Sequence, residues 1–163
     1  MHPLRRKDKA IESQEELKNI LATTKYITIA MSKDNEPYLV TLSHGYDEAK
    51  HCLYFHCAHQ GKKIEFLEAN PIVWGQAVID HGYAIGKCDH LFETVMFKGE
   101  VSFPAEEDEK RHALDVMINQ LEPDPKTVHD AQVNDKSVKR VNIGRIDISY
   151  MSGKRAKKVI IQQ

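Results

Sequence analysis

The sequence predicts one domain of mainly β structure, an antiparallel barrel of six to seven strands with peripheral helices. Short runs rich in β-branched and aromatic residues recur along the chain, separated by Asp, Asn, Gly and Pro. Only three segments are predicted as helices. The 163 residues, 41% of them hydrophobic, suffice for one buried core without disulfide or metal staples, so we expect a single domain over residues 1–163.

The N-terminal part begins with a basic, polar arm over residues 1–12. A helix is predicted from Ser13 to Thr24, because Ser13 and Glu16 can cap each other's free backbone N–H groups and apolar residues follow on one face. A turn is predicted at Asp34-Asn35-Glu36-Pro37. Three strands are predicted around it, over residues 26–32, 38–46 and 51–57.

The rest of the chain alternates between strand and helix signals. A short helix over residues 64–69 ends at Asn70-Pro71, because a residue before proline disfavours helical geometry. Strand character resumes over 71–80, turns at Asp80-His81-Gly82, and continues to Phe103. The remaining predictions are an amphipathic helix over 105–121, a loop or lid over the polar segment 122–138, and a last strand over 141–151.

Composition and charge exclude several classes of function. The formal net charge is −1 and the basic residues are dispersed, so nucleic acid is not expected as a partner. No apolar run approaches the roughly 18 residues that a membrane span needs, so no membrane is expected either. The three cysteines are an odd number and no apolar signal region precedes them, which favours the reducing cytoplasm.

The segment HCAHQGKK, residues 56–63, carries the strongest chemical signal. With His51 and Cys52 it crowds metal-ligand types together, but neighbouring residues of a strand point to opposite faces, and Cys52 and His56 would stand roughly 13 Å apart. We therefore expect no metal site. Lys62 and Lys63 at a helix start are unfavourable, because the helix N-terminus is itself positive. A bound phosphate would make this arrangement favourable, with His56 as a further donor. A solvated lysine pair on a surface turn is the alternative.

Four segments in this order resemble the FMN-binding split-barrel family that includes pyridoxamine 5′-phosphate oxidase, and within it the nitroimidazole-resistance, or Nim-type, branch. They are PYLVTLSHGYD, CLYFHCAHQGKKIEFLEANP, FETVMFKGEV and DISYMSGKRA. The resemblance runs from Thr24 to Ala156. It implies a Greek-key split barrel that forms a homodimer and holds FMN at the dimer interface.

The resemblance also implies which residues bind FMN. The strand containing Val40, Thr41, Leu42 and Ser43 would lay its backbone along the isoalloxazine ring, whose edges need fixed donors and acceptors. Other matching positions serve the phosphate or approach the flavin from the second subunit. The residues near the phosphate would be His56, Cys57, Lys62 and Lys63. The residues that approach the flavin from the second subunit would be Phe92, Glu93 and Thr94. Trp74 and Gln76 can reach the ring edge, although core packing is the favoured interpretation of Trp74.

The sequence departs from the family pattern at three places. Nim-type members tend to have His-Lys where this chain has Lys62-Lys63, and several relatives have Tyr-Arg-Ser where it has Phe92-Glu93-Thr94. The Arg-x-His segment that grips the substrate phosphate has no counterpart in KRAKKVIIQQ. We therefore do not expect a vitamin B6 oxidase. His44 and His90 are candidates for proton relay, or are simply exposed.

Four functions stay open at this point. The favoured one is an FMN-dependent oxidoreductase that acts on an unassigned small molecule. A flavin-binding protein for storage or sensing, without turnover, is the second. The third is a haem-binding split barrel with a histidine ligand, and the fourth is a cofactor-free dimer that serves as an interaction scaffold.

Overall fold

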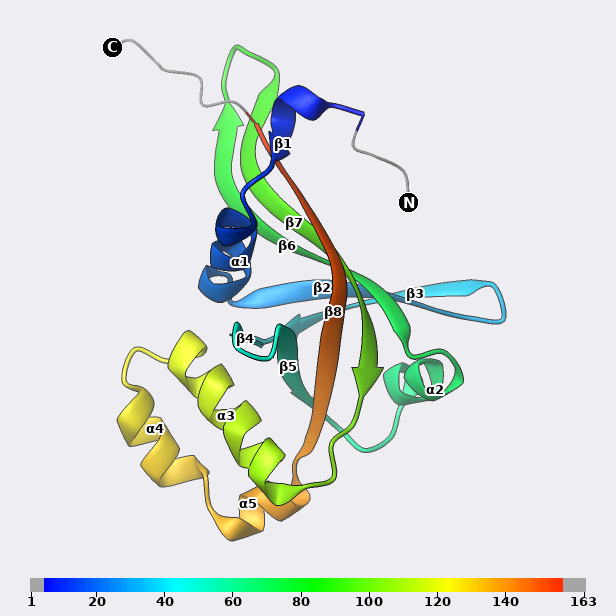
Figure 1. Cartoon of the computed structure of the whole chain (residues 1–163), viewed down its shortest axis with the longest axis vertical. Coiled ribbons are helices and arrows are strands. Elements are labelled where there is room, and N and C mark those ends of the chain that lie inside the picture. Colours follow the sequence, from blue (N-terminus) through cyan, green and yellow to red (C-terminus); the bar gives the residue numbers. More distant parts are fainter. Residues whose placement is uncertain (1–4, 157–163) are drawn as a thin grey trace.

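The computed structural model describes residues 5–156, which form one antiparallel sheet with helices around it (Figure 1). The strand order is β3-β2-β6-β7-β8-β5-β4, and β1 pairs with β8. The strands are β1 Ala10–Ile11, β2 Tyr26–Lys33, β3 Glu36–Ser43, β4 Gly45–Asp47, β5 Cys52–Cys57, β6 Ile72–Ala84, β7 Asp89–Ser102 and β8 Asn142–Arg155. The helices are the 3-10 helix η1 Lys7–Lys9, then α1 Gln14–Thr23, α2 Lys62–Ala69, α3 Glu107–Leu121, α4 Pro125–Gln132 and α5 Asp135–Arg140.

The predicted fold class, mainly antiparallel β with peripheral helices, is confirmed. The predicted count of six to seven strands is wrong, because the described residues contain eight. The extra strands are short: β1 has two residues and β4 has three, too few for a periodic pattern in the sequence. The last part of the predicted N-terminal arm belongs to the sheet, because Ala10 and Ile11 form β1 and pair with the C-terminal end of β8.

Local sequence signals explain several of the elements. α1 begins where predicted, and the Ser13 hydroxyl accepts a hydrogen bond from the backbone N–H of Glu16 at 3.3 Å. Asp34 and Asn35, with φ of 50° and 64°, form the two-residue turn between β2 and β3, a geometry that suits the twist of a hairpin. The predicted turn was two residues too long, because Glu36 already begins β3 and Pro37 lies within it. Proline is tolerated there because β3 is an edge strand.

The predicted turn at Asp80-His81-Gly82 is wrong. β6 continues to Ala84, and the chain reverses at residues 85–88. The pairing of β6 with β7 shifts between Asp80 and Tyr83, where Gly82 has a φ of 88° and donates its N–H to Asp80 Oδ1 at 2.7 Å. Turn-forming residues therefore sit in a β-bulge within a longer hairpin.

The prediction of a loop over residues 122–138 is also wrong, since this segment forms α4 and most of α5. Asp124 caps α4 by accepting from the Thr127 N–H at 3.2 Å, with Pro125 in the first turn, and Asn134 and Ser137 form a capping box for α5. α4 has no buried residue. It therefore lacks the apolar stripe on which the sequence prediction relied.

The main core lies on the face of the sheet that α1 covers, and a second cluster lies beneath α3. The largest buried side chains of the main core include Ile27, Ile29, Phe55 and Phe97. α3 approaches the sheet closely at Gly45, where a Cβ would lie 2.8 Å from the Cα of Met117. Figure 1 shows α3, α4 and α5 grouped at one end of the sheet, with α2 at the other side of that end.

The opposite side of the sheet, which we call the outer face, exposes apolar side chains. One row of side chains crosses five neighbouring strands, because each residue is the register partner of the next. The row runs from Leu39 on β3 through Ala30 on β2, Trp74 on β6 and Lys98 on β7 to Tyr150 on β8. Leu39 is 63% exposed and Trp74 is 42% exposed. Within residues 5–156, no helix is both long and apolar enough to cross a bilayer.

Candidate functional site

The four residues predicted to serve a phosphate lie close to one another along the chain, where β5 ends and α2 begins, but His56 turns its side chain to the face of β5 opposite to that of Cys57. Lys62 Nζ lies 2.8 Å from Glu36 Oε1, at the start of β3. It also lies 4.8 Å from the centre of the Tyr38 ring. The hydrogen bond from Lys62 lowers the pKa of the Glu36 carboxyl, although both side chains are solvent-exposed. Lys62 therefore joins the β5–α2 segment to the β2–β3 hairpin, and Glu36 occupies part of its donor capacity.

The N-terminus of α2 is open. Gly61 is its N-cap residue with a φ of 125°, and among the described residues no side chain caps this helix. A Cβ at position 61 would meet nothing within 4 Å. The first N–H groups of a helix lack intrahelical acceptors and carry the positive end of the dipole. Lys63, half-buried with its Nζ 5.4 Å from the centre of the Phe55 ring, adds a second cation beside this end.

His56 and Cys57 diverge, as strand geometry predicts. His56 is exposed, whereas Cys57 is half-buried and its sulfur accepts a hydrogen bond from Asn142 Nδ2 at 3.5 Å. Burial raises the pKa of the Cys57 thiol, even though the charge of Lys63 and the Asn142 hydrogen bond act in the other direction. The thiol therefore stays protonated near neutral pH. Across residues 5–156 no three His, Cys, Asp or Glu side chains are grouped closely enough to hold a metal ion.

The strand predicted to lie along the flavin ring is an edge strand. Val40 and Leu42 turn their side chains to the core, whereas Thr41 and Ser43 lie on the outer face. The Thr41 and Thr28 hydroxyl oxygens lie 3.0 Å apart. Every second residue of an edge strand directs its N–H and C=O away from the sheet. β3 can therefore offer backbone donors and acceptors to a ligand without using its side chains.

Phe92, Glu93 and Thr94 lie elsewhere, in the first part of β7 near the β6–β7 hairpin (Figure 1). Thr94 donates its hydroxyl to the Ala77 carbonyl at 2.9 Å, so this hydroxyl is already engaged. Strand alternation places Glu93 on the side of α1, opposite to its neighbours Phe92 and Thr94. Within one chain this group is therefore not brought together with the lysine pair.

Three further expectations can be compared with the structure. Core packing of Trp74 is wrong, because this side chain lies on the outer face with its ring 5.9 Å from that of Tyr150. His44 is fully buried, with Nε2 2.9 Å from the Leu21 carbonyl oxygen. His90 is exposed and lies 2.7 Å from Asp80. A buried histidine between a helix and a strand cannot exchange protons readily with a surface ligand.

Two residues that take part in these contacts were not predicted from the sequence. Glu36 was assigned to a turn, and Arg155 was named only within the segments DISYMSGKRA and KRAKKVIIQQ. The alternation of Glu36 and Tyr38 on one strand could have suggested a shared surface. No local pattern marks Arg155, whose partners Glu16 and Glu93 come from α1 and β7.

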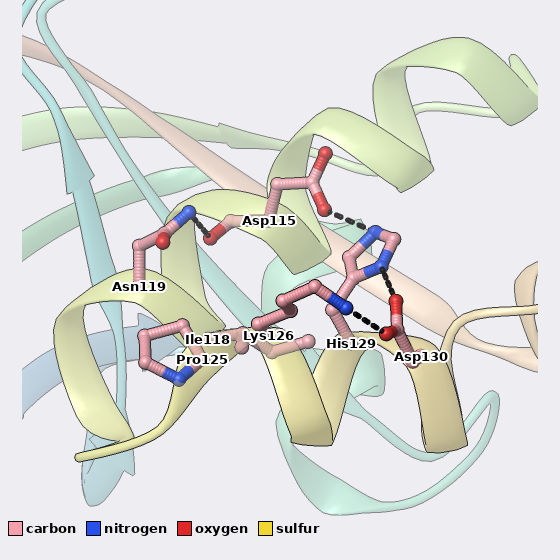
Figure 2. Close-up of a pocket in the computed structure, with 7 residues that line it drawn as sticks. All are labelled: Asp115, Ile118, Asn119, Pro125, Lys126, His129 and Asp130. Atoms are coloured by element: carbon pink, nitrogen blue, oxygen red, sulfur yellow. Dashed lines mark hydrogen bonds and ion pairs between the residues drawn. The ribbon is translucent and has the colours of Figure 1, made fainter.

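A pocket of about 370 Å³ lies between α3 and α4 and is lined by residues of both helices (Figure 2). His129 lies between two carboxylates, with Nε2 2.8 Å from Asp115 Oδ1 and Nδ1 3.8 Å from Asp130 Oδ1. Lys126 Nζ pairs with Asp130 at 2.7 Å. None of the predicted site residues lines this pocket. The contact of His129 with Asp115 links α4 to α3, whereas the two contacts of Asp130 lie within α4.

Comparison with known proteins gives consistent results. Residues 13–155 match the family model described as pyridoxamine 5′-phosphate oxidase. A candidate 5-nitroimidazole antibiotic resistance protein from Bacteroides thetaiotaomicron is 27% identical with a TM-score of 0.76, covering 89% of this chain and 85% of that one. A FAD-binding protein from Mesorhizobium loti is 24% identical with a TM-score of 0.66, covering 91% and 97%.

A third similar structure is the flavocytochrome Anf3 from Azotobacter vinelandii, at 18% identity and a TM-score of 0.80, covering 96% of this chain and 73% of that one. At this identity the likeness concerns the fold alone. A comparison with curated protein sequences finds no match.

Proposed function

The chain belongs to the pyridoxamine 5′-phosphate oxidase-like split-barrel family, and we propose that it is a flavin-dependent oxidoreductase that binds FMN between the subunits of a homodimer. The substrate is a small molecule. FMN when bound supplies the redox chemistry, and the residues of the chain hold the cofactor and control access to it.

One observation supports the proposal most: two lysines flank an uncapped, open helix N-terminus beside an edge strand. A phosphate monoester would receive the first backbone N–H groups of α2 together with the ammonium groups of Lys62 and Lys63. The adjoining edge of β3 would offer backbone groups to a planar ring. The residues present therefore fit a cofactor with a ring at one end and a phosphate at the other.

The outer face supports the homodimer. Five large apolar side chains on this face are between 37% and 63% exposed: Tyr26, Leu39, Ile72, Trp74 and Val78. Apolar surface of this kind is typical of a protein interface. One flavin can contact both the lysine pair and the Phe92–Thr94 segment only if a second subunit supplies one of them. A second copy placed on the outer face would meet both needs.

The proposal is tested first by the absorbance spectrum of the freshly purified protein, followed by identification of whatever heat releases. We expect a flavin spectrum and released FMN. Released FAD would change the cofactor assignment, and a haem absorption band would favour the haem-binding alternative. A colourless protein that takes up no added flavin would contradict the proposal.

Variants then locate the phosphate. Lys63→Ala should weaken FMN binding by about tenfold, because one charge-assisted contact is lost. Lys87→Ala removes the same charge from the exposed turn at residues 85–88 and should leave binding unchanged. Riboflavin, which lacks the phosphate, should bind both variants and the natural protein equally. Equal loss of riboflavin and FMN in Lys63→Ala would place the lysine outside the phosphate site.

The dimer is tested by light scattering after size-exclusion chromatography. Trp74→Glu should yield monomers with weakened flavin binding, because a charge would be buried in an apolar interface. Gln132→Glu adds the same charge on the exposed surface of α4 and should remain dimeric. If Trp74→Glu stays dimeric, the outer face is not the interface.

Turnover separates an oxidoreductase from a storage or sensing protein. The bound flavin is reduced with NAD(P)H or dithionite, and its reoxidation by added small-molecule acceptors is followed by absorbance. Reoxidation faster than that of free reduced FMN supports an enzyme. Protection of the reduced flavin from every acceptor would favour storage or sensing.

A further inference from the structure

A second hollow lies at the base of the β6–β7 hairpin, on the side of the sheet where α1 lies. It measures about 400 Å³ and is lined by His81, Leu91, Phe92, Glu93, Arg155 and Ala156, which we call the Glu93 pocket. Its volume is at the lower end of the range for small-molecule sites. A ligand of the size of one aromatic ring with a short side chain would fill it.

The polar groups of the Glu93 pocket form a short chain of contacts. Glu93 Oε2 lies 3.1 Å from His81 Nε2, and Glu93 Oε1 lies 3.6 Å from Arg155 Nη1. The Glu93 side chain is 30% exposed, so its carboxylate is reachable from solvent. An ionised carboxylate has about four acceptor positions. Two partners therefore leave capacity for a further donor.

The charge balance decides what the Glu93 pocket can accept. The guanidinium of Arg155 faces Glu16 of α1 as well as Glu93, so two carboxylates already share it. Glu15 and Glu16 also line an adjacent hollow that shares Glu93 with this pocket. An entering anion would meet these carboxylates, whereas an entering cation would be attracted by them.

We infer that the Glu93 pocket binds a small amine, with an apolar body against Leu91 and Ala156 and a protonated amino group on Glu93. Within the segment proposed to approach the flavin, only Glu93 turns its side chain to the side of α1, whereas Phe92 and Thr94 lie on the outer face. Binding of the amine therefore needs no flavin, and the two proposals can fail separately.

The probes are phenethylamine, phenethyl alcohol and 3-phenylpropionate, which present similar bodies with a positive, neutral or negative end. Binding to the full-length protein is measured by NMR titration, with and without added FMN. We expect phenethylamine to bind at least about tenfold more tightly than the alcohol, the ratio for one hydrogen bond to a charged group. The amide signals of Leu91 and Ala156 should shift.

Three variants test the assignment. Glu93→Gln keeps the shape and should abolish the advantage of the amine over the alcohol, whereas Glu68→Gln makes the same charge change on the exposed surface of α2 and should not. Leu91→Ala should weaken the amine and the alcohol alike, because both lose the same apolar contact. Tighter binding of 3-phenylpropionate, saturation by no probe, or an undiminished amine preference in Glu93→Gln would overturn the inference.

Discussion

The hydroxyl of Tyr54 forms a hydrogen bond between the sheet and α3, and removing this hydroxyl tests how much the bond contributes to stability. Tyr54 lies on β5, is fully buried, and donates its hydroxyl to Glu109 Oε1 of α3. The same carboxylate accepts hydrogen bonds from Lys50 Nζ at 2.6 Å and from Arg145 Nη1 at 3.0 Å. Tyr54→Phe deletes one oxygen and keeps the ring.

The size of the effect follows from these contacts. A hydrogen bond to a charged group contributes about 1.5–3 kcal/mol to stability. Lys50 and Arg145 continue to pair with Glu109 in the variant, so no unpaired charge is left behind. We therefore expect a loss of about 2 kcal/mol in the free energy of unfolding, or about 4–8 °C in Tm for a chain of this length.

The loss should depend on pH. Burial on its own would raise the pKa of Glu109, but the hydrogen bonds from Lys50 and Tyr54 and the charges of Lys50 and Arg145 outweigh it, so the pKa is lowered from 4.5. The unfolded chain then binds more protons in acid. The stabilisation is complete above the unfolded pKa and disappears as pH falls through the folded one. The natural protein and Tyr54→Phe should therefore converge in stability in acid.

Urea unfolding followed by circular dichroism measures both effects, at about pH 7 and again near pH 3. Tyr83→Phe is the matched control, because Tyr83 is 56% exposed and lies in the β6–β7 hairpin, and it should stay within about 0.5 kcal/mol of the natural protein. A Tyr54→Phe protein as stable as this control at neutral pH would refute the assignment. A deficit of the same size at both pH values would show that packing, and not the carboxylate, is responsible.

Three further predictions concern other parts of the molecule. Burial lowers the pKa of His44 from 6.5 despite its hydrogen bond to Leu21, so the unfolded chain is protonated before the folded one as pH falls. Urea unfolding should therefore show stability falling as pH drops below about 6.5. His44→Gln should remove this pH dependence, and a slope that persists would show that another group titrates. Gly45→Ala would place a Cβ 2.8 Å from the α3 backbone and should lower stability by about 1–3 kcal/mol in thermal unfolding, and a neutral result would mean that α3 packs less closely. Glu36→Gln frees Lys62 and should strengthen FMN binding several-fold in a fluorescence titration, whereas weaker binding would show that Glu36 supports the site.

The helices illustrate how far sequence patterns reach. α1 and α3 were predicted because apolar residues recur on one face, and Leu17, Ile20 and Leu21 of α1 are indeed buried. α4 was not predicted because it buries none of its residues and depends on the Asp124 cap and on Pro125 in its first turn. The bulge at Asp80 escaped for a related reason, since the same residue types form turns and bulges.

The candidate site divides in the same way. The lysine pair at the start of α2 could be found from sequence, because a cation pair at a helix N-terminus is a local contradiction that an anion resolves. Sequence patterns were enough to predict the family, from the order of four segments, and the positions of most strands along the chain and the lysine cluster, which depend on residues near one another. Only the tertiary structure placed Glu36 on Lys62, Trp74 on the outer face, and Glu16 and Glu93 around Arg155. Those arrangements depend on strand register and on how α1 packs against the sheet, and a one-residue shift in register would move each side chain to the opposite face.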